Sequence, residues 1–190
     1  ERVAVIVGNS LEFPILVMAC AKIGAIMVPI NVKLSAAEVS YIIGHSKPSI
    51  LIIEDEFKPL LEECTTDEIP ENIVFIKGTQ DDDFSNNLLI QDQLHPVELN
   101  EEDPLFIVYT SGTTGRPKGA TLSHVGVIHS LINYQQRFQS DDECRTLIAV
   151  PFFHVTGLIG QFLHMVYVGG SCVVLRQYQN EAYISLSYTH

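Results

Sequence analysis

Short runs of β-branched and other apolar residues recur through the first third of the chain. Residues 3–7, 26–30 and 50–53 each form such a run, and the first is followed at once by Gly8 and Asn9. Runs of four to six apolar residues bounded by turn-forming residues are typical of buried strands. The pattern therefore predicts three strands, the first ending in a turn.

The two segments between these strands have the periodicity of helices. In the first, Ser10 is placed to cap a helix whose apolar residues recur three and four positions apart. In the second, Ser35 and Glu38 have the spacing of a capping box, and Gly44 is expected to end the helix. The inward-facing residues predicted for the two helices are Phe13, Leu16, Val17, Cys20, Ala21 and Gly24, then Val39, Ile42 and Ile43.

Strands that alternate with amphipathic helices predict an α/β fold, with a mostly parallel sheet and helices on both faces. The pattern weakens between positions 67 and 103, where a strand at 73–76, an acidic loop at 81–83 and a short helix at 88–94 are expected. Three adjacent carboxylates in a loop are usually exposed charge, so we favour a solvated loop over a metal site. The elements predicted beyond it are a strand at 105–109, a helix capped by Ser123, a strand at 147–150, a helix at 158–168 and a last strand at 171–175.

Charge and composition narrow the classes of function. The 190 residues carry 11 Lys and Arg against 23 Asp and Glu, a formal net charge of −12, which disfavours nucleic acid as a partner. No apolar run reaches the roughly 18 to 20 residues that a membrane span needs. The four cysteines are widely spaced, which favours reduced thiols and a cytoplasmic protein.

The segment after the strand at 105–109 contains the most informative chemistry. Its glycines allow backbone N–H groups to surround an oxyanion, its hydroxyl groups add donors, and Lys118 adds a positive charge. A Walker A loop is excluded because Pro117 precedes Lys118 and Gly119 follows it. The alternatives are a phosphate-binding loop and a surface turn without a ligand. The candidate phosphate contacts are Thr110, Ser111, Gly112, Thr113, Thr114, Gly115, Lys118 and Gly119.

Residues 109–119, YTSGTTGRPKG, resemble the AMP-binding signature of the adenylate-forming superfamily, which includes acyl-CoA synthetases, luciferases and peptide-synthetase adenylation domains. Residues 151–157, PFFHVTG, resemble the next motif of that family. The opening of the chain is also similar to the N-terminal part of a fatty-acid–CoA ligase. The resemblance covers residues 1–175 as a partial N-terminal AMP-binding domain. We expect residues 176–190 to be a divergent or truncated tail and the family's C-terminal domain to be absent.

The resemblance implies activation of a carboxylate, most simply a fatty acid, by ATP and Mg²⁺ to an acyl-adenylate, followed by transfer to coenzyme A. It assigns Lys118 to the phosphates and His154 to a gate beside the acyl site; without the motif, His154 would be interpreted as a core histidine. Arg116 is expected to face solvent. A fragment of this kind is expected to be inactive alone and to self-associate through exposed edges. The alternatives are an adenylation domain that loads a carrier protein, a luciferase-like oxygenase, and a non-catalytic nucleotide-binding or interaction module.

Overall fold

The structure is a computed structural model that describes residues 1–77, 97–110, 116–180 and 185. Within these residues, six strands form one sheet in the order β4-β3-β1-β2-β5-β6. The pairs from β4 to β5 are parallel, and β6 runs antiparallel to β5. The strands are β1 (Arg2–Ile6), β2 (Ile26–Pro29), β3 (Ile50–Glu54), β4 (Asn72–Ile76), β5 (Pro104–Thr110) and β6 (Lys118–Ser123). The predicted α/β class with a mostly parallel sheet is confirmed.

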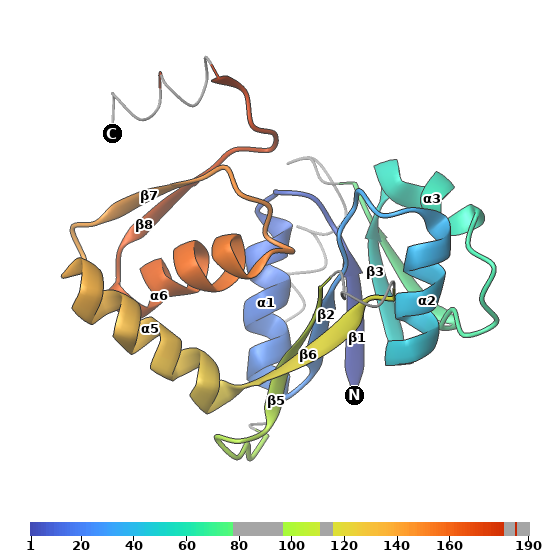
Figure 1. Cartoon of the computed structure of the whole chain (residues 1–190), viewed down its shortest axis with the longest axis horizontal. Helices are drawn as coiled ribbons and strands as arrows, with labels where there is room; N and C mark the ends of the chain where they lie inside the picture. The colour runs from blue at the N-terminus through green and yellow to red at the C-terminus, as the bar shows by residue number, and fades with distance from the viewer. Residues whose placement is uncertain (78–96, 111–115, 181–184, 186–190) are drawn as a thin grey trace, which may run out of the picture.

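Helices cover both faces of this sheet. In Figure 1, α1, α5 and α6 lie to the left of the sheet, and α2 and α3 lie to its right. The alternation of side chains along β1 supplies both cores, because Val3 and Val5 join the α1 side while Ala4 and Ile6 join the α2 side. The helices are α1 (Glu12–Ile23), α2 (Ala36–Ser46), the 3₁₀ turn η1 (Asp55–Phe57), α3 (Lys58–Glu62), α5 (His124–Phe138), the π-helix η2 (Thr156–Leu163) and α6 (His164–Val168).

The order of strands places a crevice at the carboxyl edge of the sheet. The chain passes from β1 to β2 on one side and then returns to β3 on the other side of β1. Such a reversal separates the two connecting loops, and ligands of open α/β sheets bind outside the carboxyl ends of the strands at this point. We therefore expect the segments that follow β1 and β3 to border a ligand-binding site.

A second, two-stranded parallel sheet pairs β7 (Arg145–Ile148) with β8 (Ser171–Val174). It lies beyond α6 at the upper left of Figure 1. The two strands were predicted, but not that they would form a sheet of their own. The strand predicted at 147–150 begins and ends two residues earlier, as β7, because residues 149 and 150 belong to the turn that follows it.

Helix boundaries show where local sequence signals succeed. The Ser35 hydroxyl accepts the Glu38 backbone N–H at 3.4 Å, and the Glu38 carboxylate accepts the Ser35 backbone N–H at 2.9 Å, which confirms the predicted capping box. This pairing lowers the pKa of Glu38, because the bonds from Ser35 favour the ionised carboxylate. The Ser123 cap is confirmed as well, since its hydroxyl accepts the Gly126 N–H at 3.3 Å.

Other boundaries were predicted wrongly. Ser10 does not cap α1: Leu11 occupies the N-cap position, and the buried Ser10 hydroxyl has no hydrogen-bond partner within the described part of the chain. Gly44 does not end α2, which runs on to Ser46 and stops where Lys47 adopts a left-handed conformation. The predicted helix at 158–168 is a π-helix continued by the short α6. The acidic loop at 81–83 and the helix at 88–94 lie outside the described residues. Within the described ranges, no helix is long and apolar enough to cross a bilayer.

Candidate functional site

The first wall of the candidate site is the hairpin formed by β5 and β6. Thr110 lies opposite Lys118 and Tyr109 opposite Gly119 in its antiparallel ladder. The segment 110–119 was predicted as one continuous loop, but Lys118 and Gly119 belong to strand β6, because their pairing with β5 extends that far. Ser111, Gly112, Thr113, Thr114 and Gly115 lie outside the described residues. The described ends bring the Thr110 hydroxyl group and the Lys118 ammonium group to the same end of the hairpin.

Gly119 has a packing reason to be glycine. A Cβ atom there would lie 2.8 Å from Cγ2 of Ile107 and 3.1 Å from the ring of Tyr109. Gly119 does not have positive φ, so the conformational freedom we invoked for an anion nest is not used at this position. Its contact with phosphate stays a prediction.

The second wall is the turn at residues 151–157, which contains the second family-like motif. The His154 N–H donates to the Pro151 carbonyl at 3.1 Å, and the Leu158 N–H donates to the His154 carbonyl at 2.9 Å. A Cβ atom on Gly157 would lie only 2.5 Å from the Pro151 oxygen. The turn is therefore tightly folded and depends on the absence of a side chain at position 157.

The His154 imidazole is exposed and has a defined orientation. Its Nδ1 accepts the Thr156 backbone N–H at 3.3 Å and lies 3.1 Å from the Thr156 hydroxyl oxygen. In the neutral ring this leaves the proton on Nε2, for which the described residues supply no hydrogen-bond partner. His154 is thus not a buried core histidine, and its surroundings fit a side chain that contacts substrate.

The hairpin and the turn face one cavity of about 270 Å³. Thr110 and Pro117 line it from the hairpin, while Phe153, His154 and Val155 line it from the turn. The cavity therefore joins the two motifs, which lie about 40 residues apart in the sequence. Lys118 is exposed at the start of β6 and lies beside the cavity-lining Pro117.

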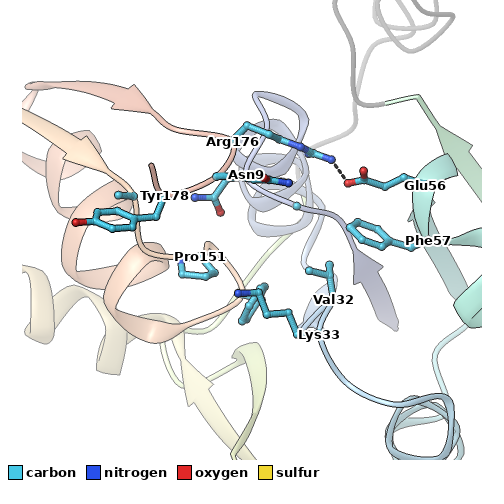
Figure 2. A pocket seen from close by; sticks show the side chains of 12 residues that line it. Asn9, Val32, Lys33, Glu56, Phe57, Pro151, Arg176 and Tyr178 are labelled. Atoms are coloured by element: carbon cyan, nitrogen blue, oxygen red, sulfur yellow. Dashed lines mark hydrogen bonds and ion pairs between the residues drawn. The ribbon is translucent and has the colours of Figure 1, made fainter. Parts of the chain in front are cut away.

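A larger cavity of about 670 Å³, which Phe153 lines as well, lies at the carboxyl edge of the strands (Figure 2). Its walls come from the segments that follow β1, β2, β3, β7 and β8, and they include Asn9, Lys33, Phe57 and Arg176. This is the crevice that the reversal of strand order predicts. Both cavities depend on how the 151–157 turn sits against the main sheet.

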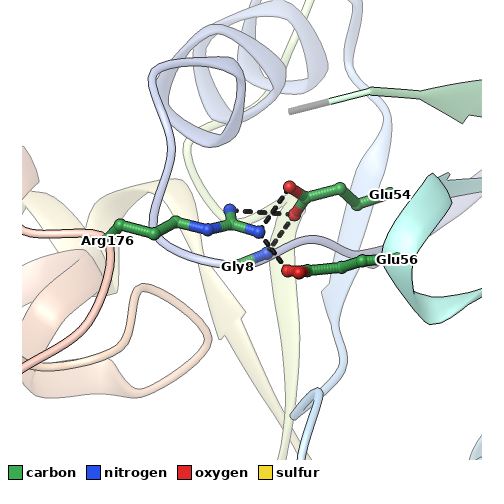
Figure 3. Close-up of polar contacts among 4 residues, drawn as sticks. All are labelled: Gly8, Glu54, Glu56 and Arg176. Atoms are coloured by element: carbon green, nitrogen blue, oxygen red, sulfur yellow. Dashed lines mark hydrogen bonds and ion pairs between the residues drawn. The ribbon is translucent and has the colours of Figure 1, made fainter. Parts of the chain in front are cut away.

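An ion-pair cluster contributes Glu56 and Arg176 to the lining of this crevice (Figure 3). Glu54 is 2% exposed and accepts hydrogen bonds from the Gly8 N–H and from Arg176 Nη1, each at 3.0 Å. Arg176 also pairs with Glu56. Burial alone would lower the pKa of Arg176, but its bonds and attraction to Glu54 and Glu56 outweigh that effect and raise it. The cluster ties the segment after β8 to the ends of β1 and β3.

Asn9 makes a second tie at the same edge. Its side-chain amide bonds to the backbone of both segments that follow β7 and β8. Asn9 was predicted to lie in a turn, and no role was predicted for Glu54 or Arg176. A polar residue at or just beyond the end of an apolar strand is the signal that could have singled out Asn9 and Glu54, because the ends of parallel strands meet at the carboxyl edge.

With this geometry in place, comparison with known proteins identifies the class. The chain matches the AMP-binding enzyme family over residues 1–186, and it belongs to that family. It is 35% identical over 159 residues to the long-chain-fatty-acid–CoA ligase FadD13 of Mycobacterium tuberculosis, which covers 83% of this chain and 31% of that protein. It is 34% identical over 177 residues to the 2-succinylbenzoate–CoA ligase of Bacillus licheniformis, which covers 93% of this chain and 34% of that protein. The chain thus spans about a third of the length of these relatives.

Solved structures agree with the fold. The N-terminal domain of FACL13 from Mycobacterium tuberculosis superposes with a TM-score of 0.83 at 28% identity, over 98% of this chain and 46% of that one. ATP-bound MatB from Rhodopseudomonas palustris also gives a TM-score of 0.83, over 99% of this chain and 37% of that one; at 22% identity it supports the fold alone. The resemblance drawn from the sequence is confirmed, and the fold is that of the N-terminal domain of adenylate-forming enzymes.

Proposed function

We propose that the chain provides the triphosphate-binding hairpin and one wall of the acyl site of an ATP-dependent acid–CoA ligase. The observation that carries the proposal is the shared cavity of about 270 Å³. Thr110 and Pro117, at the described ends of the hydroxyl- and glycine-rich hairpin, line it together with His154. The reaction has two steps. A carboxylate oxygen attacks the α-phosphorus of ATP and pyrophosphate leaves; the thiol of coenzyme A then attacks the acyl carbon and AMP leaves.

In the first step the hairpin acts by position and charge. The hydroxyl groups of Thr110, Ser111, Thr113 and Thr114, the glycine N–H groups and Lys118 would hold the β- and γ-phosphates. Pyrophosphate would then leave in line with the incoming carboxylate. The substrate is the magnesium complex of ATP. Glu38 is the carboxylate among the residues that line the cavity, and its Oε2 accepts hydrogen bonds from both the backbone N–H and the hydroxyl of Ser35. The ion would enter on the phosphates of the nucleotide.

On the acyl side, the cavity suits an apolar carboxylate. Pro29, Leu34 and Val155 supply apolar surface around His154. His154 would stand between the acyl group and the phosphates, with its Nε2–H directed at an oxygen of the substrate. The named activity of FadD13 supports a fatty acid as the substrate class. FadD13 and the 2-succinylbenzoate–CoA ligase are both CoA ligases, which supports coenzyme A as the acceptor.

The test is ATP–pyrophosphate exchange driven by a panel of carboxylates of increasing chain length. The chain is assayed beside the longest open reading frame that contains it, since the chain spans about a third of its relatives. We expect exchange with apolar carboxylates from the longer polypeptide and none from the chain alone. Absence of exchange with every carboxylate from the longer polypeptide would contradict the ligase, and exchange by the chain alone would contradict its dependence on further sequence.

A further inference from the structure

Asn9 has a buried side-chain amide. Both of its polar atoms form hydrogen bonds that link the end of β1 in the main sheet to the segments that follow β7 and β8 in the second sheet. Asn9 follows β1 and is 8% exposed. Its Nδ2 donates to the Val150 carbonyl at 3.1 Å and to the Leu175 carbonyl at 3.2 Å, and its Oδ1 accepts the Phe152 N–H at 2.9 Å. Two donors and an acceptor in one short planar group are what an asparagine offers. In Figure 2, Asn9 lies between the segments that carry Arg176 and Pro151.

These bonds hold the backbone that carries His154. The Phe152 N–H is two residues before His154, and the Val150 carbonyl opens the same turn. The ring of Phe152 is 1% exposed and stacks on Phe13 of α1, with ring centroids 5.2 Å apart. Asn9 therefore fixes the turn's backbone while Phe152 fixes its core side, and both attachments are made to the β1–α1 unit.

The hairpin reaches the cavity from the same sheet. β5 is separated from β1 only by β2, so β1 and the hairpin belong to the same hydrogen-bonded sheet. The bonds of Asn9 thus set the spacing across the cavity between the hairpin and His154. In a reaction that needs an in-line approach of two groups, a displacement on the order of 1 Å can cost about 100-fold in rate.

We propose that Asn9 is a positioning residue, which holds the 151–157 turn so that the acyl group faces the α-phosphate of ATP. The role rests on the proposed function, because it concerns the acyl wall of that same site. It predicts a selective defect. Loss of the bonds lets the turn shift, so carboxylate binding and turnover suffer, while the phosphates stay held by the hairpin.

The variants are Asn9→Asp, which keeps the acceptor for Phe152 but loses both donors, and Asn9→Ala, which loses all three bonds. The control is Asn133→Asp, the same substitution at an exposed position of α5 that is not among the residues lining either cavity. All are made in the longest open reading frame, and exchange is measured against carboxylate and ATP separately. We expect KM for the carboxylate to rise about tenfold with a lower kcat, and KM for ATP to stay within about twofold, since positioning is lost on one side only. Asn133→Asp should match the parent.

A second measurement does not require activity. In the 190-residue chain, the ring resonances of His154 are compared by nuclear magnetic resonance among the parent, Asn9→Asp and Asn133→Asp. We expect a shift in the Asn9 variant alone.

The outcomes separate the two proposals. Absence of ATP–pyrophosphate exchange by the unsubstituted protein would contradict the proposed function. The His154 resonances would then still test whether Asn9 positions the turn. Exchange by the parent with both KM values unchanged in the folded Asn9 variants would overturn the role of Asn9, as would unmoved His154 resonances. Unfolding of both variants would also overturn it, since Asn9 would then act on the whole fold.

Discussion

The two walls of the smaller cavity are built in opposite ways. The hairpin wall reaches the cavity at the end of the β5–β6 ladder, where Thr110 and Lys118 are exposed. The turn wall is held from the interior by Asn9, by the stacked ring of Phe152 and by the close approach of Gly157. The comparison teaches that substitutions in the hairpin should change chemistry more than stability, and substitutions in the turn should change stability as well.

The largest effect is expected at Lys118. Lys118→Ala should lower ATP–pyrophosphate exchange by about 10²- to 10³-fold, because a positive charge aimed at the phosphates is lost. The free energy of unfolding should change by less than about 0.5 kcal/mol, since the side chain is exposed. Exchange kinetics and urea unfolding measure the two quantities, with Lys22→Ala on α1 as the control. Unchanged exchange would remove Lys118 from the site.

The turn should respond through stability. Gly157→Ala places a Cβ 2.5 Å from the Pro151 oxygen, so the turn must open, at a cost of about 2–3 kcal/mol. The matched control is Gly160→Ala in the same π-helix, where a Cβ would meet its nearest neighbours, atoms of Tyr134, at an ordinary 3.8 Å. Urea unfolding compares them. Equal stability of the two variants would contradict the tightly folded turn.

Loss of the ion pair between Arg176 and Glu54 should have a smaller effect on the free energy of unfolding. Arg176→Met leaves the buried Glu54 carboxylate without its cation, and we expect a loss of about 2 kcal/mol, less than for a fully buried pair because Arg176 is partly exposed. Adding Glu54→Gln should restore more than half of that loss, since the uncompensated charge is then gone. A double-mutant cycle by urea unfolding measures the coupling, and additive losses would show that the pair is not coupled.

The smallest effect concerns pH. His164 is 4% exposed, its Nε2 is 2.7 Å from the Ser140 hydroxyl oxygen, and burial lowers its pKa from 6.5. The unfolded state therefore binds the proton more readily, so stability is complete above about pH 6.5 and falls as the pH drops towards the lowered pKa. Thermal unfolding between pH 7.5 and 5 should show this decline, and His164→Gln should make the curve shallower. A parallel decline in both proteins would assign the pH dependence to other groups.

Local signals in the sequence were enough for much of the main sheet. The apolar run at residues 3–7 predicts the strand observed as β1, and the Ser35–Glu38 box marks the start of α2. Both depend on neighbours within four positions. The predicted Ser10 cap of α1 was wrong: Leu11 occupies the N-cap position, although serine is the better capping residue.

The ties at the carboxyl edge could not be predicted, because they join positions far apart. Asn9 contacts Leu175 across 166 positions, and Arg176 contacts Glu54 across 122. No pattern of hydrophobic spacing encodes such pairs. The motif at 151–157 predicts a site role for His154, which lines the smaller cavity, but the sequence alone did not show that Asn9 bonds to the turn that carries it.

A titration of the ¹⁵N-labelled chain with magnesium–ATP, followed by nuclear magnetic resonance, tests most directly whether the hairpin and the turn form one nucleotide site. We expect the amide signals of residues 110–119 to move first and that of His154 to move with the same dependence on ligand concentration. Signals that move only at a different surface, with those of the hairpin and His154 unchanged at saturation, would contradict the site.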